Sequence, residues 1–140
     1  MFQKILVAYD GSEGSRRALQ TGIALAKALG AELSTISVIE HLPHYAATVG
    51  EVKEAQEEFE AFFHDLVKQA RDLAALQGVE LETVVKPGPE VETIVTHAAD
   101  GGFDLLVVGF VGHSKIWGRL MGSTSQNLAR LAPCTVMVVK

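Results

Sequence analysis

The sequence predicts an α/β protein in which helices cover both faces of a parallel β-sheet. Five short segments rich in Val, Ile and Leu alternate with longer segments whose apolar residues recur at helical spacing. Alternating strands and helices favour right-handed crossovers between parallel strands. The expected strands are Ile5–Tyr9, Leu33–Ile39, Leu81–Val85, Asp104–Val108 and Thr135–Val139. Ile5–Tyr9 is a continuous apolar run, which is typical of a strand that is buried on both faces.

Along the chain, the first helix is expected before the second strand and the second helix after it. Ser12 is suited to cap a helix that continues to about Leu29 and stops at Gly30. A polar loop containing Pro43 precedes a long helix, which runs from about residue 51 to residue 77. One apolar face of this helix is expected from Val52, Ala55, Phe59, Phe62, Leu66 and Leu73.

Two shorter helices complete the alternation. Pro87-Gly88-Pro89 predicts a turn, with Pro89 at the first position of the third helix. This helix has an apolar side and ends at Gly101-Gly102. The fourth helix is expected over Ser123–Leu131, immediately before the last strand.

Length and composition favour one domain over residues 1–140. A chain of 140 residues that is 48% hydrophobic can form a core without metals or disulfides. The net charge of −5 does not favour a nucleic-acid partner. Apolar runs are too short for a signal peptide or a membrane span, so a cytoplasmic protein is expected. Cys134 is the single cysteine and is expected to be a buried, inert thiol.

A spaced glycine motif follows the fourth expected strand. It consists of Gly109-Phe110-Val111-Gly112, nine further residues and then Gly122-Ser123 at the expected helix start. Glycine lets the backbone approach an anion closely, and a helix N-terminus offers free N–H groups and partial positive charge. The pattern therefore predicts a phosphate cradle, although the glycines alone could equally form tight turns. Neither of the two best-known phosphate-binding glycine motifs occurs in the chain.

Asp10 ends the first strand, as Gly109 follows the fourth. In open parallel sheets, ligands bind beyond the carboxyl ends of the strands where the strand order reverses. If these two strands are neighbours, Asp10 and Gly109 face the same crevice. The Asp10 carboxylate could accept hydrogen bonds from ribose hydroxyls or bind Mg²⁺ through water; alternatively, it only caps the first helix.

Three segments together resemble the universal stress protein family. They are Ala8-Tyr9-Asp10-Gly11-Ser12-Glu13, the spaced glycine motif, which resembles the signature of the family's ATP-binding branch, and the ending from Ala132 to Val139. The resemblance covers essentially the whole chain. It implies a Rossmann-like, five-stranded parallel sheet of order 3-2-1-4-5, with the first and fourth strands at the switch point.

The resemblance also implies residue roles. The backbone of Val38 matches the family position that reads the adenine edge. Gly109, Gly112, Gly122 and Ser123 are the phosphate-side candidates, with Thr124 a further hydroxyl. His113, together with Lys115 and Arg119, could offset phosphate charge. The implied ligand is ATP together with Mg²⁺, with ADP or AMP as alternatives. No metal-ligating residues of the protein are assigned.

Three functions remain open from the sequence. The first is an adenine-nucleotide-binding sensor or regulator of the stress response, and the others are a nucleotide-independent dimeric interaction module and a slow ATPase. Phe110 and Val111 are bulkier than is common between these glycines in the family, which bears on affinity. No Ser-His-Asp, Cys-His or paired-carboxylate arrangement indicates catalysis. A homodimer through the apolar edge strand Thr135–Val139 is expected, and an unidentified protein partner is possible.

Overall fold

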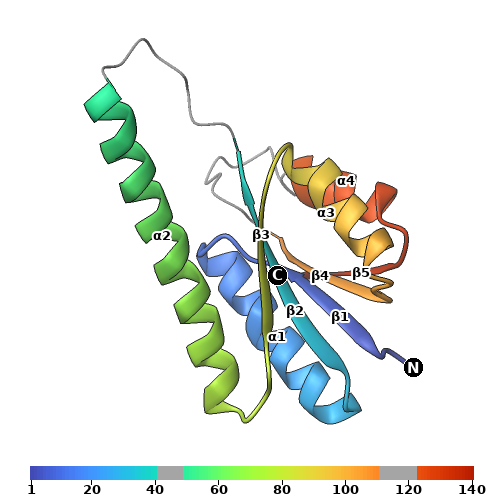
Figure 1. The fold of residues 1–140 in the computed structure, drawn as a ribbon. Coiled ribbons are helices and arrows are strands. Elements are labelled where there is room, and N and C mark those ends of the chain that lie inside the picture. The colour runs from blue at the N-terminus through green and yellow to red at the C-terminus, as the bar shows by residue number, and fades with distance from the viewer. Residues whose placement is uncertain (41–48, 111–122) are drawn as a thin grey trace.

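A five-stranded parallel sheet forms the centre of the molecule (Figure 1). The structure is a computed structural model that describes residues 1–40, 49–110 and 123–140. Its strands are β1 (Lys4–Ala8), β2 (Glu32–Ile39), β3 (Glu82–Pro87), β4 (Leu105–Gly109) and β5 (Thr135–Val139). They pair in the order β3-β2-β1-β4-β5, and every pairing is parallel. The predicted fold class and strand order are therefore confirmed.

Two helices cover each face of the sheet. The helices α1 (Glu13–Leu29) and α2 (Val49–Leu76) lie on one face, and α3 (Glu90–Asp100) and α4 (Ser123–Leu131) lie on the other (Figure 1). Strand side chains alternate between two apolar cores. Ile5 and Val7 of β1 pack with α1 and α2, whereas Leu6 packs with α3 and α4. This period-2 alternation explains why the central strands read as continuous apolar runs.

The two ends of α1 that the sequence predicts are confirmed. Ser12 is the N-cap, and its side chain accepts a hydrogen bond from the Ser15 N–H. Gly30 ends the helix in the left-handed conformation, with φ 65°. Both ends are thus determined by local chemistry that is visible in the sequence.

The turn before α3 differs from the prediction. Pro87 is the last residue of β3, and Pro89 is the N-cap of α3 in an extended conformation, so the first helical residue is Glu90. A proline at the end of an edge strand is tolerated because its missing N–H breaks no ladder that continues beyond it. Glu90 and Glu92 in the first turn complement the helix dipole in place of a side-chain cap.

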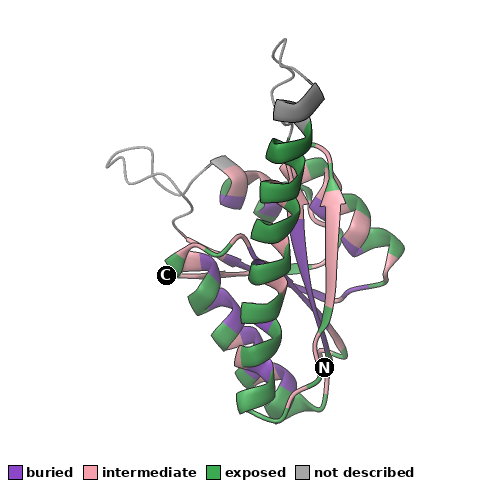
Figure 2. Ribbon diagram, turned by 60° about the vertical axis from the view of Figure 1, so that its left-hand side comes forward, coloured by how far each residue is buried: buried purple, intermediate pink, exposed green. Residues whose placement is uncertain are grey.

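The predicted apolar face of the long helix is only half correct. Leu66, Ala70 and Ala74 in the C-terminal half of α2 are buried against the sheet and α1. Ala55 is exposed, and Phe62 retains 55% of its surface. The N-terminal half of α2 projects beyond the sheet, so its apolar residues have no core to enter (Figures 1 and 2).

Cys134 is half-buried rather than fully buried. Burial is the main cause that raises the pKa of its thiol, which favours the protonated, unreactive form. Among the described residues, no helix is both long and apolar enough to cross a membrane.

Candidate functional site

The strand order reverses between β1 and β4. These neighbours pair in parallel, with Ile5 beside Leu105 and Val7 beside Val107. The chain leaves β1 toward α1 on one face of the sheet, whereas α4, which follows β4 in the chain, lies on the other face (Figure 1). Asp10 and Gly109 are therefore brought to the same edge of the sheet, as predicted, where a crevice is expected.

Asp10 is held by a hydrogen-bonded turn. Its Oδ1 accepts a hydrogen bond from the Ser12 N–H (2.9 Å), and its own N–H donates to the Ser15 Oγ (3.3 Å). The Ser15 hydroxyl in turn donates to the Ser12 carbonyl (3.0 Å). Because Ser12 is the N-cap, Asp10 is not the cap of α1; it organises the preceding turn. The turn fixes the direction of the carboxylate at the reversal point.

Gly109 lies where two helices begin. A Cβ at this position would lie 2.7 Å from the backbone carbonyl carbon and oxygen of Gly14, so close packing against α1 by itself requires glycine. On the side of α4, the Ser125 hydroxyl donates a hydrogen bond to the Gly109 carbonyl (2.8 Å). The first turns of α1 and α4 therefore converge on the end of β4.

The backbone of Val38 points toward the end of β1. The Ile36 carbonyl accepts a hydrogen bond from the Tyr9 N–H (3.0 Å), and residues two apart in a strand direct their backbone groups to the same side. Strand β1 stops at Ala8, which pairs with Ile36. The N–H and C=O of Val38 therefore face the space beyond the last pair of this ladder.

Tyr9 and Ser37 form a buried, hydrogen-bonded pair next to this edge. The Ser37 hydroxyl donates to the Tyr9 carbonyl (2.7 Å), and both residues are buried. The Tyr9 ring enters the core beneath α1 and α2, and its hydroxyl has no hydrogen-bond partner among the described residues. Burial is the main cause that raises the pKa of Tyr9, so the phenol is neutral at physiological pH.

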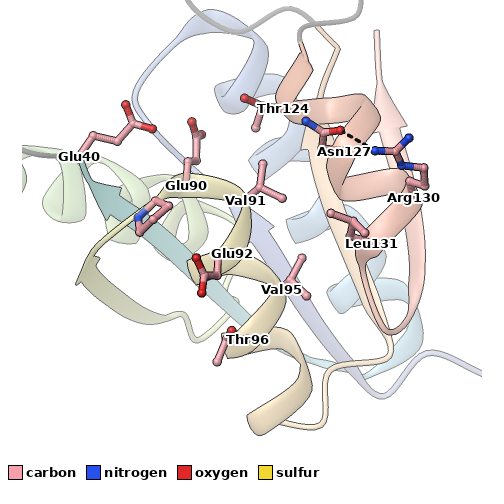
Figure 3. A pocket seen from close by; sticks show the side chains of 11 residues that line it. Glu40, Glu90, Val91, Glu92, Val95, Thr96, Thr124, Asn127, Arg130 and Leu131 are labelled. Carbon is pink, nitrogen blue, oxygen red and sulfur yellow. Dashed lines mark hydrogen bonds between the residues drawn. The ribbon is translucent and has the colours of Figure 1, made fainter.

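A groove between α3 and α4 adjoins the carboxyl edge (Figure 3). Its volume is about 740 Å³, within the range of small-molecule sites. Val91, Val95 and Leu131 give it apolar walls, and Thr124 and Glu40 lie at the end nearest the strand ends. Of the predicted site residues that the structure describes, Thr124 is the one that lines this groove.

Phe110 turns its ring toward the edge strand β5. The ammonium of Lys140 lies 5.4 Å from the centre of the Phe110 ring, a cation–π contact. The Phe110 N–H also donates to the Val139 carbonyl (2.8 Å). The bulk of this residue is therefore placed beside the end of β5.

Several predicted residues lie outside the described part of the chain. They are Gly112, His113 and Gly122, together with Val111, Lys115 and Arg119. Ser123 is the first residue of α4, and Thr124 follows it. Within the described ranges, no group of three His, Cys, Asp or Glu side chains could hold a metal ion.

The sequence reasoning missed three serines that build this edge. Ser15 and Ser125 occupy the first turns of the two helices at the reversal point, and Ser37 supports Tyr9 from β2. A signal was available, because Ser37 is a polar residue inside an apolar strand and the other two stand at helix starts. The partners of Ser37 and Ser125 follow only from the tertiary structure, whereas those of Ser15 lie within five residues.

Comparison with known proteins identifies the family. The model of the universal stress protein family matches residues 1–140. The chain belongs to the universal stress protein family. Universal stress protein YxiE of Bacillus subtilis is 33% identical over an alignment that covers all of both chains.

Solved structures of the family have the same fold. The universal stress protein UspA from Lactobacillus plantarum superposes with a TM-score of 0.85 at 25% identity, covering 99% of this chain and 98% of that one. A universal stress protein in complex with cAMP has a TM-score of 0.78 at 30% identity, with 99% and 97% coverage. A relative of this family therefore holds an adenine nucleotide.

Proposed function

We propose that this universal stress protein binds an adenine nucleotide at the carboxyl ends of β1 and β4 and acts as a sensor or regulator in the stress response of the cytoplasm. The favoured ligand is ATP with Mg²⁺, and ADP, AMP and cAMP are competitors for the same crevice. The observation that carries the proposal is the meeting of Asp10 with the starts of α1 and α4 at the strand-order reversal.

The described residues suit a nucleotide in a defined direction. The first turns of two helices supply partial positive charge and N–H groups near Gly109, which favours phosphates there. Glu40 and Glu90 make the end of the groove nearest β2 acidic, which disfavours phosphates at that end. The base then lies toward β2, where the Val38 N–H and C=O are available to its edge. Asp10 stands between the two ends, suited to ribose hydroxyls.

Magnesium fits this arrangement only with the nucleotide present. Mg²⁺ is commonly held by one or two carboxylates together with substrate phosphates and water. Asp10 supplies a carboxylate at the reversal point, and its Oδ1 accepts a hydrogen bond from the Ser12 N–H. The ion would offset phosphate charge there.

The test begins with mass spectrometry of the nucleotide that the purified protein retains, followed by calorimetric titration with ATP and Mg²⁺, AMP and cAMP. Asp10→Asn keeps an oxygen for the Ser12 N–H but removes the negative charge. We expect this variant to weaken ATP–Mg²⁺ binding by about tenfold, or 1.4 kcal/mol.

Asp104→Asn is the matched control. Asp104 also accepts backbone hydrogen bonds, from Gln3 (2.8 Å) and Lys4 (3.0 Å), but at the opposite edge of the sheet. ATP affinity should be unchanged in this variant. A purified wild-type protein that retains no nucleotide and binds none at millimolar concentration would contradict the proposal and favour a nucleotide-independent interaction module.

A further inference from the structure

An aromatic patch stands on the projecting half of α2. It consists of Phe59, Phe62 and Phe63. The rings of Phe59 and Phe63 lie 4.9 Å apart at 54°, and those of Phe62 and Phe63 lie 5.2 Å apart, edge to face. Phe62 keeps 55% of its surface exposed. Figure 2 shows this half of the helix as almost entirely exposed.

The core of the protein accounts for only part of the patch. Phe59, Phe63, Leu66, Ala70 and Ala74 follow one another at three- and four-residue steps along one side of α2. The last three are buried. Phe63 is partly buried and packs against the core cluster, whereas Phe59 is partly buried but lies beyond that cluster. The same apolar stripe that anchors α2 thus continues past the body of the molecule. An exposed aromatic ring clustered with partly exposed ones is typical of protein interfaces.

Carboxylates border the patch on both sides. Glu58 and Asp65 lie one helical turn from Phe62, and Glu60 lies one turn from Phe63. From residue 53 to residue 65 the helix carries five carboxylates and one lysine. In the described part of the chain, none of the five takes part in an ion pair. Two copies meeting through this surface would bring like charges together, which disfavours self-association.

We propose that the aromatic patch and its flanking carboxylates bind a cationic amphipathic helix of a partner protein. Apolar side chains of such a helix would cover Phe59 and Phe62 at matching three- and four-residue steps, and its Lys or Arg side chains would pair with Glu58, Glu60 and Asp65. This interaction surface is separate from the carboxyl edge and does not depend on nucleotide binding.

The probe is a fluorescein-labelled peptide of about 18 residues with leucine on one helical face and lysine on the other. Fluorescence anisotropy measures its binding to the full chain. Phe62→Ala should weaken binding at least about fivefold, since a truncated aromatic anchor commonly has such an effect. Leu76→Ala is the matched control, because Leu76 is 79% exposed on the same helix but far from the patch.

A second pair of variants tests the charge. Glu58→Gln with Asp65→Asn should weaken binding and flatten its dependence on salt. Glu32→Gln with Glu80→Gln changes the net charge by the same amount at exposed positions away from the patch. This control double variant should bind the peptide with an affinity within about twofold of the wild-type value. Circular dichroism checks that each variant is folded.

Several outcomes overturn the proposal. If the two double charge variants weaken peptide binding equally, the cationic peptide is attracted to the acidic protein as a whole and not to the patch. Equal binding of a peptide with glutamate in place of lysine, or no effect of Phe62→Ala, would exclude the patch as the site. If Phe62→Ala instead converts a dimer to a monomer in light scattering, the patch joins two copies of this chain.

Discussion

At the scale of single residues, small side chains decide how closely the elements meet at the carboxyl edge. Gly109 permits the end of β4 to touch the backbone of Gly14, which a Cβ would prevent. Ser15, Ser37 and Ser125 direct hydroxyl groups to backbone groups of the same edge. A glycine in the spaced glycine motif thus has a packing reason of its own, and its contact with phosphate stays a prediction.

Ser125→Ala tests the link between α4 and β4. The Ser125 hydroxyl is buried and is a donor to the Gly109 carbonyl, so its removal leaves a part-buried acceptor without this partner. We expect a loss of about 1 kcal/mol in the free energy of unfolding, measured by urea denaturation. Gln126→Ala, at the exposed neighbouring position, should change stability by less than about 0.5 kcal/mol. Equal effects of the two changes would show that the hydrogen bond contributes nothing.

At the scale of elements, the two edges of the sheet differ in protection. The edge strand β3 contains Lys86 and ends at Pro87, both of which discourage pairing with another strand. The opposite edge strand, β5, has the sequence TVMVV and no charged residue before Lys140. Its residues from Val136 to Val139 are only partly buried. The expectation of a homodimer through β5 stays a prediction, and this contrast supports it.

Val138→Pro tests that dimer. Because the Val139 carbonyl bonds back to β4, the N–H of Val138 points outward from the sheet edge. Proline removes this donor without breaking the ladder to β4, so a dimer joined through β5 should shift to monomer on dilution. Light scattering coupled to gel filtration measures the mass. A wild-type mass near the chain value of 15.0 kDa at micromolar concentration would mean that the protein does not form this dimer.

At the scale of the whole molecule, the fold and the proposed ligand are coupled. The candidate site consists of segments that are far apart in the chain and meet only when β1 and β4 pair. A ligand that binds there stabilises the folded state and not the unfolded chain. The stability of the whole protein therefore reports on occupancy of the site.

Thermal unfolding with ATP and Mg²⁺ measures this coupling. At about a hundred times the dissociation constant, binding should add roughly 2.7 kcal/mol to the free energy of unfolding. For a chain of this size, the midpoint should rise by roughly 8 °C. UTP with Mg²⁺ is the control, since it carries the same phosphates on another base. An equal rise with UTP would indicate phosphate binding without recognition of adenine.

The sequence by itself determined the succession of elements, since each depends on neighbours in the chain. Ser12 and Gly30 cap the two ends of α1 as predicted, because capping uses groups within a few residues. Apolar runs identified the strands for the same local reason. The strand order and Asp10 at the reversal point were predicted only with the aid of the family resemblance, since pairing of parallel strands is not encoded at short range.

Only the tertiary structure decided what the local pattern left open. Periodicity predicted a buried face along all of α2, but the length of the sheet limits burial to Leu66 and the residues after it, and Phe62 is exposed. Likewise, the requirement for glycine at position 109 comes from Gly14, almost a hundred residues earlier in the chain. The physical reason is the same in both cases. A sequence pattern shows which side chains favour burial, but contacts between distant segments decide which of them reach it.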